Sequence, residues 1–345
     1  MSQPSPSRSQ EPCPSCGVSL EVGGESFFAT VRCPQCHDEV IVRRMAGPYF
    51  LVEVLGQGGS GKVFRARREG EADVALKVLD KESEDYHENL RLLRNEANCG
   101  RAVDHPNVVK VLDLEEDDEG ARLIMELMEG GSLHDRIVSG DKIPERLVLQ
   151  LGVEILKALE AIQELGMSHR DLKPANILFS AEGVAKLGDF GLARGHEAIP
   201  VSQSHLFATP DYVAPEILGG FQGDLRSEFY SLGGCLYHAL AGKPPYDTEG
   251  LALSELQRIK ATQVRMDEGT RTNQETRELI DRMMTPDPDF RFQTCADVEL
   301  KLMSALKSLG SPGLWRRGNR RSRSRNANPR SGGVLHFLFR WINRN

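Results

Sequence analysis

The chain has 345 residues and a formal net charge of −7, with 39% hydrophobic and 27% charged residues. This length and composition allow a real buried core, so disorder is not the default expectation, and there is room for one large or two modest domains. No apolar run approaches the roughly 20 residues of a membrane-spanning helix, and the first residues have no apolar signal-peptide core, so we expect a cytoplasmic protein.

Residues 1–12 are rich in Ser, Pro and Gln, and we predict that they form a disordered lead-in. Residues 13–42 then form a module of their own, in which two Cys-Pro-x-Cys turns flank a segment, 18–31, that suits a small hairpin. Each turn directs two thiolates at one tetrahedral ion, so the module is predicted to be a zinc ribbon. Its ligands would be Cys13, Cys16, Cys33 and Cys36.

The alternative for these four cysteines is disulfides or free thiols. The other three cysteines, Cys99, Cys235 and Cys295, are scattered through globular sequence, as is typical of a reducing compartment, and this favours zinc. A structural zinc leaves the purpose of the module open, because such ribbons bind nucleic acid, bind proteins or cap a domain.

From residue 49 the pattern predicts a first lobe, 49–128, that is rich in strands. The predicted strands are 50–55, 63–67 and 74–79, followed by a charged helix at 82–99 and two short apolar runs at 108–114 and 123–128. A second lobe, 129–309, changes to helical periodicity, with helices at 147–165 and 229–241. The second of these is almost uncharged and is interpreted as the buried centre of that lobe.

A glycine-rich turn, Gly56, Gly58 and Gly61, lies between the first two strands and lets backbone amides approach phosphate oxygens. By itself this is a weak signal, since plain hairpins use the same glycines. The phosphate loop of nucleotide hydrolases is excluded, because Val63 occupies the position of its magnesium-binding hydroxyl and a strand follows instead of a helix.

Lys77 ends an apolar strand, where a buried ammonium is costly unless it is paired. Glu96, on the next predicted helix, can supply the partner; the alternative is a solvated surface lysine. The decisive segment runs from His169 through Asp171, Lys173 and Asn176, with Asp189-Phe-Gly after a short turn. It joins a proton-accepting carboxylate, a cation for a phosphoryl group, and two oxygen ligands for Mg²⁺.

This ordered set of motifs resembles the protein kinase family over residues 49 to about 305, in particular its bacterial serine/threonine members. The resemblance implies an α+β, two-lobed fold behind the zinc ribbon, and transfer of the γ-phosphoryl group of Mg-ATP to protein substrates in signalling. It implies that Asp171 positions or deprotonates the substrate hydroxyl, Lys173 stabilises the moving phosphoryl group, and Asn176 and Asp189 hold Mg²⁺. The ATP-binding residues it implies are Gly56, Gly58, Gly61, Val63, Ala75, Lys77, Glu96, Met125, Glu126, Met128 and Leu178.

The segment from Thr209 to Glu216 resembles the end of a serine/threonine kinase activation segment, in which Thr209 would bond near Asp171. The same pattern implies a structural ion pair between Glu216 and Arg291. His205 stands where a phosphorylated residue is common, so we hypothesise autophosphorylation at Ser202 or Ser204; the alternative is that both are simply solvated.

The chain departs from the family pattern at two positions. Glu228 stands in place of the usual Asp that accepts bonds from the catalytic-loop backbone, and we expect its extra methylene to alter the rate. Gly100 replaces a larger apolar residue four positions after Glu96, which we expect to loosen that helix.

Residues 310–345 form a basic tail. Residues 311–345 hold nine Arg, no Lys and no acidic residue, so removing these nine charges from −7 leaves −16 on the other 310 residues. Two interpretations of this tail are equally open. It could dock on an anionic membrane or on nucleic acid, or it could be plain solvated disorder. The alternative function for the whole chain is an inactive nucleotide-binding scaffold that recruits partners through the ribbon and the tail.

Overall fold

The computed structural model describes residues 10–22, 25, 27–58, 61–81, 85–140, 142–195, 210–267 and 269–310. Residues 1–309 make up one compact unit, and residues 310–345 are a second unit. No helix within the described ranges combines the length and the apolar character that crossing a membrane would require.

The N-terminal module consists of two separate hairpins, and each carries one cysteine pair. The first pairs β1 (Gln10–Pro12) with β2 (Ser19–Glu21), and the second pairs β3 (Ala29–Arg32) with β4 (Glu39–Val42). The expected hairpin within 18–31 is therefore wrong, because β2 and β3 each pair with the strand on the other side of their own Cys-Pro-x-Cys turn. The structure also differs from the predicted lead-in at residues 10–12, which pair with β2.

A six-stranded antiparallel sheet follows, in the order β5-β6-β7-β8-β10-β9. Its strands are β5 (Met45–Ala46), β6 (Tyr49–Gly58), β7 (Gly61–Arg67), β8 (Val74–Asp80), β9 (Val111–Glu116) and β10 (Gly120–Glu126). Apolar side chains occupy both faces of β8: Ala75 and Leu79 belong to one cluster, and Leu76 and Val78 to another. Because successive side chains of a strand point to opposite faces, this sheet has two apolar faces to cover.

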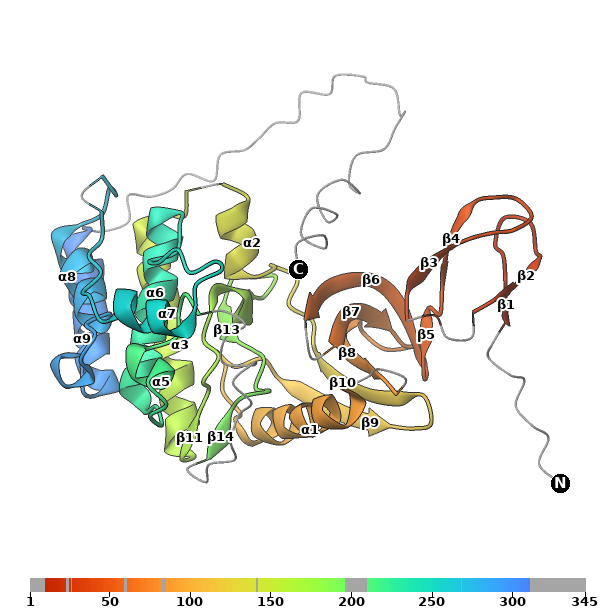
Figure 1. Cartoon of the computed structure of the whole chain (residues 1–345), viewed down its shortest axis with the longest axis horizontal. Helices are drawn as coiled ribbons and strands as arrows, with labels where there is room; N and C mark the ends of the chain where they lie inside the picture. Colours follow the sequence, from red (N-terminus) through yellow and green to blue (C-terminus); the bar gives the residue numbers. More distant parts are fainter. Residues whose placement is uncertain are drawn as a thin grey trace, which may run out of the picture. The chain divides into compact units, whose positions relative to one another are not determined.

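Helix α1 (Tyr86–Ala102) covers the first face and contacts β8, β9 and β10 (Figure 1). Its buried residues Leu90, Leu93 and Ala97 recur at helical spacing and pack in the cluster of Ala75 and Leu79. We call this cluster the inner cluster and that of Leu76 and Val78 the outer cluster. The helix begins four residues later than the sequence predicted and ends three residues later.

The second lobe is mostly helical. Its helices are α2 (Leu133–Val138), α3 (Glu145–Glu164), α5 (Pro215–Leu218), α6 (Leu225–Ala241), α7 (Leu253–Lys260), α8 (Gln274–Met283) and α9 (Cys295–Ser308), with short 3₁₀ turns at Pro174–Asn176 and Pro288–Phe290. Its short strands are β11 (Met167–Ser168), β12 (Ile177–Phe179), β13 (Ala185–Leu187) and β14 (Arg194–Gly195).

Helix α6 lies at the centre of this lobe, where it contacts α3 and α8 (Figure 1). The Asp224 side chain caps its start by accepting from the backbone N–H of Arg226, and Gly242, with a φ of +70°, ends it. Phe229 and Leu232 are completely buried, as predicted from the nearly uncharged sequence. The predicted α+β fold, with a strand-rich lobe followed by a helical lobe, is confirmed.

Candidate active site

A buried ion pair joins the sheet to helix α1. Nζ of Lys77, on β8, lies 2.7 Å from Oε2 of Glu96, on α1, and 3.6 Å from Oδ1 of Asp189. Burial alone would lower the pKa of Lys77, but the charges of Asp189 and Glu96 outweigh it and raise that pKa. The ammonium is therefore held in its charged form beside two carboxylates.

Three of the predicted polar residues lie on the loop between β11 and β12 and contact one another. Nζ of Lys173 lies 2.8 Å from Oδ2 of Asp171, and the side-chain amide of Asn176 donates to Oδ2 of Asp171 at 2.9 Å and to its backbone carbonyl at 2.8 Å. Because the amide nitrogen is used in this way, the carbonyl oxygen of Asn176 remains as a ligand atom for a hard cation. Burial raises the pKa of Asp171, although the charge of Lys173 opposes the shift.

Asp189 follows β13 and has a φ of +63°, in the left-handed region. Its Oδ1 accepts from the backbone N–H of Gly191 at 3.3 Å. Burial alone would raise the pKa of Asp189, but the charges of Lys77 and Lys173 lower it, so this carboxylate is ionised at neutral pH. An ionised carboxylate, as on Asp189, and an amide oxygen, as on Asn176, are both suitable ligands for Mg²⁺.

Asn95 is a site residue that sequence reasoning missed. Its side-chain amide donates to the carbonyls of Phe190, Gly191 and Ala193, at 3.3, 3.2 and 2.7 Å. It thus ties α1, next to Glu96, to the backbone that follows Asp189. The only signal in the sequence was a polar residue beside a predicted buried glutamate.

The residues expected around adenine lie in or against the inner cluster. Ala75 and Met125 are buried members, and Val63, Met128 and Leu178 pack against them. The backbone N–H of Glu126 donates to the carbonyl of Lys110, and its carboxylate pairs with Lys186 at 2.8 Å.

In the glycine-rich turn, Gly58 pairs with Gly61 across the hairpin, and Gly56 pairs with Val63. Gly61 has a φ of +129°, and a Cβ there would lie 2.8 Å from the carbonyl oxygen of Val78. Both the conformation and the close approach require glycine at this position.

The comparisons with known proteins agree with this geometry. Residues 49–302 match the family model described as the protein kinase domain. The chain belongs to the protein kinase family. Over 264 residues it is 31% identical to a probable serine/threonine-protein kinase of Clostridium perfringens. The aligned region covers 75% of this chain and 38% of that protein.

Two further relatives are also named serine/threonine-protein kinases. PknA of Corynebacterium glutamicum is 33% identical, covering 71% of this chain and 53% of PknA. PrkC of Bacillus subtilis is 29% identical, covering 77% of this chain and 42% of PrkC. The chain thus spans about half, or less, of the length of these relatives.

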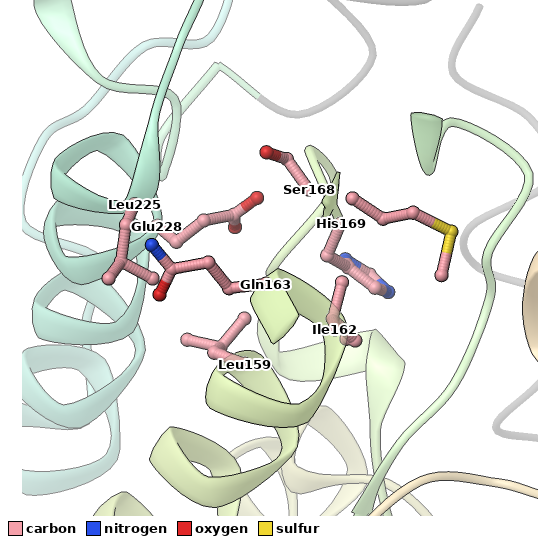
Figure 2. A pocket seen from close by; sticks show the side chains of 8 residues that line it. Leu159, Ile162, Gln163, Ser168, His169, Leu225 and Glu228 are labelled. Atoms are coloured by element: carbon pink, nitrogen blue, oxygen red, sulfur yellow. The ribbon is translucent and has the colours of Figure 1, made fainter. Parts of the chain in front are cut away.

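Glu228 on α6 contacts the backbone of the loop between β11 and β12. Its Oε1 accepts from the backbone N–H of Arg170 at 2.8 Å, and burial raises the pKa of its carboxyl group. A cavity of about 20 Å³, the size of a water molecule, lies beside it. Figure 2 shows the residues around this cavity, among them Leu159, Ile162, Gln163, Ser168, His169, Leu225 and Glu228.

The backbone around this contact is unusual. Arg170 has a φ of +68°, and within the described residues its buried Nε has no hydrogen-bond partner. His169 is completely buried, with Nε2 3.0 Å from the carbonyl oxygen of Gly188 and its ring 5.1 Å from that of Phe190. The hydrogen bond from the N–H of Arg170 shows that the longer side chain at position 228 still reaches the backbone of this loop.

Gly100 lies where α1 meets β9. A Cβ built at this position would lie 2.4 Å from Cγ2 of Val111 and 3.9 Å from Cδ2 of Phe190. The side chain of Val111 thus occupies the space that a larger residue at position 100 would need. The expected loosening of the helix stays a prediction, but the close approach gives glycine a packing reason here.

The predicted ion pair between Glu216 and Arg291 is formed. Two guanidinium nitrogens of Arg291 lie 2.7 and 2.8 Å from the two carboxylate oxygens of Glu216, and Arg291 is 1% exposed. The carbonyls of Thr285, Pro286 and Arg226 accept its remaining donors. Burial alone would raise the pKa of Glu216, but Arg291 lowers it.

The four N-terminal cysteines come together as predicted. Their Sγ atoms all lie within 4.8 Å of one another, with 3.7 Å between Cys13 and Cys36 and 3.6 Å between Cys16 and Cys33. Four thiolates around zinc, each about 2.3 Å from the ion, lie about 3.8 Å apart. The spacing and the donor type fit a structural zinc ion.

Some predicted features lie outside the described residues. They are Thr209, the proposed phosphorylation sites Ser202 and Ser204, and the Arg-rich tail.

Proposed function

We propose that this kinase transfers the γ-phosphoryl group of Mg-ATP to serine or threonine hydroxyls of protein substrates in signalling. The observation that carries the proposal is the placement of Lys77 within 3.6 Å of Asp189, with Asp171, Lys173 and Asn176 joined by hydrogen bonds on the neighbouring loop. The similarity to proteins named serine/threonine-protein kinases supports serine and threonine as acceptors.

Each side chain has a role in this proposal. Lys77, held by Glu96, binds the α- and β-phosphates, and the backbone of the glycine-rich turn covers the phosphates. Val63, Ala75 and Leu178 sandwich the adenine, Met125 lies behind it, and the backbone of Glu126 and Met128 meets its edge. Asn176 and Asp189 would hold Mg²⁺, which would supply positive charge to offset the charge of the phosphates.

In the reaction, Asp171 orients the substrate hydroxyl and accepts its proton as the oxygen forms a bond to the γ-phosphorus. The bond from that phosphorus to the oxygen it shares with the β-phosphate breaks, and ADP leaves with the electron pair. Lys173, 2.8 Å from Asp171, stabilises the charge on the moving phosphoryl group.

The test is incorporation of labelled phosphate into a generic basic protein by the full chain with ATP and Mg²⁺. Asp189→Ala is expected to abolish incorporation, because it removes an ionised metal ligand. A chain that binds nucleotide but transfers no phosphate, and whose binding is unchanged by Lys77→Ala, would overturn the proposal. Nothing in the described residues favours that alternative of an inactive scaffold, since the full set of charged groups lies together.

A cytoplasmic location, a structural role for zinc, phosphorylation at Ser202 or Ser204, and membrane or nucleic-acid binding by the tail stay predictions.

A further inference from the structure

The outer face of the strand-rich lobe is apolar and almost fully buried. The outer cluster includes Leu51, Phe64, Leu76, Val78 and Ile124, which are all at most 5% exposed. An antiparallel sheet that shows one face to water usually carries polar residues there. Since α1 packs on the opposite face, another part of the chain must cover this one.

Two phenylalanines of the cysteine module contribute to this cover. Phe27 is a buried member of the outer cluster, and Phe28 packs against it with its ring 5.8 Å from that of Phe64. Both lie in the segment between Cys16 and Cys33, so each end of this segment is attached to the four-cysteine cluster. The two phenylalanines that pack on the lobe and the cysteines of the metal site therefore belong to the same stretch of chain.

Arg43, just after β4, connects the module to β8 through polar contacts. Its guanidinium lies over the ring of Phe27, 4.1 Å from the ring centre, and its Nη1 lies 3.1 Å from Oδ2 of Asp80. Its backbone N–H donates to Glu11 of β1, and its carbonyl accepts from the N–H of Phe28 at 3.1 Å. Asp80 is the last residue of β8.

The contact reaches the active site through β8. Leu76 and Val78, which pack in the cluster that Phe27 completes, are the immediate neighbours of Lys77. Because side chains alternate along a strand, Lys77 points to the opposite face, where it meets Glu96. Loss of packing on the outer face would therefore loosen the strand segment that positions Lys77.

We propose that zinc at the four cysteines closes the loop that presents Phe27 and Phe28, and that zinc occupancy thereby sets the stability and nucleotide affinity of the ATP-binding lobe. Without the ion, the segment between Cys16 and Cys33 gains conformational freedom, and holding it on the lobe then costs more loop-closure entropy. By linkage, nucleotide and zinc each strengthen the binding of the other. The nucleotide part of this inference rests on the proposed function; the stability part does not.

The test uses the full chain, with and without a zinc-selective chelator that leaves Mg²⁺ in solution. Zinc removal is expected to lower the melting temperature by about 5 °C or more and to speed amide exchange in β7 and β8. The Kd of a fluorescent ATP analogue is expected to rise about fivefold. Unchanged exchange in residues 74–80 together with an unchanged Kd would overturn the proposal.

Phe27→Ala separates the contact from the metal. It is expected to retain one zinc per chain, because four cysteines make one site, and still to show the lower melting temperature and faster exchange. Zinc removal should then change this variant less than the natural chain, whereas an equal change would overturn the coupling. Phe27→Leu, which keeps an apolar side chain, serves if the alanine variant does not fold.

Phe221→Ala is the matched control, because this phenylalanine is 72% exposed on the other lobe. It is expected to leave the melting temperature and its response to zinc unchanged. If the chain binds no nucleotide with or without zinc, the proposed function fails, while melting and amide exchange still decide the inference about the module.

Discussion

Nζ of Lys77 lies 2.7 Å from Oε2 of Glu96, and their side chains are only 6% and 3% exposed. Breaking a buried pair by removing one charge typically costs about 3–5 kcal/mol, because the other charge stays buried without its partner. When Glu96 loses its charge, the carboxylate of Asp189, whose Oδ1 lies 3.6 Å from Nζ of Lys77, still compensates part of the charge of Lys77. We therefore expect Glu96→Gln to lower kcat/KM for ATP by at least about tenfold, or about 1.4 kcal/mol, measured by steady-state kinetics.

Glu88→Gln is the matched control for this prediction. Glu88 is on the same helix and pairs with Arg91, but both side chains are more than 40% exposed, and surface pairs contribute little. Equal kinetics for Glu96→Gln and Glu88→Gln would show that the buried pair does not position Lys77.

The pH dependence of the reaction follows from Asp171. This residue must be ionised to accept a proton, and burial raises its pKa above the ordinary value against the opposing charge of Lys173. The rate is therefore expected to be full above the raised pKa and to fall as the pH drops through it. Lys173→Met removes the opposing charge. The midpoint of the acid limb in the pH profile of kcat/KM should therefore move to higher pH, and the maximum of kcat/KM should fall. An acid limb with the same midpoint in both proteins would contradict this assignment.

A side chain at position 100 is predicted to force α1 away from β9. In Gly100→Ala the new methyl group would lie 2.4 Å from Cγ2 of Val111, and such overpacking typically costs about 1–3 kcal/mol. We expect a lower free energy of unfolding in urea, together with weaker nucleotide binding, because α1 carries Glu96.

Val111→Ala provides the internal control, since it removes the atom that the new methyl group would meet. Combined with Gly100→Ala, it should destabilise the protein less than the sum of the two single changes. Strict additivity would mean that the clash is relieved elsewhere.

Arg291 is predicted to be a major contributor to the stability of the helical lobe. Arg291→Met leaves the carboxylate of Glu216 without its bidentate partner, so we expect a loss of about 3–5 kcal/mol in urea unfolding. Arg226→Met is the comparison, because Arg226 bonds to the more exposed Asp224 and Asp289 and should cost less than about 1 kcal/mol. Similar losses for the two variants would contradict the special role of the buried pair.

Much of the candidate site could be predicted from the sequence, because its chemistry depends on residue types at short spacings. Asp171, Lys173 and Asn176 lie within six residues of one another, and the two Cys-Pro-x-Cys turns are equally local. Burial patterns along strands and helices also follow from local periodicity, which is why the strand-rich and helical lobes were predicted correctly. The predicted first and last residues of the elements differ from the observed ones by a few residues.

Other contacts between distant segments, unlike the predicted pairs Lys77–Glu96 and Glu216–Arg291, were decided only by the tertiary structure. No local pattern indicates that Asn95 meets the backbone after Asp189, that Val111 fills the space beside Gly100, or that β2 pairs with β1 and not with β3. The same holds for Phe27, whose apolar side chain by itself says nothing about which surface it covers. Local sequence determines which groups are present and which elements form, whereas packing free energy summed over the whole chain determines which surfaces meet.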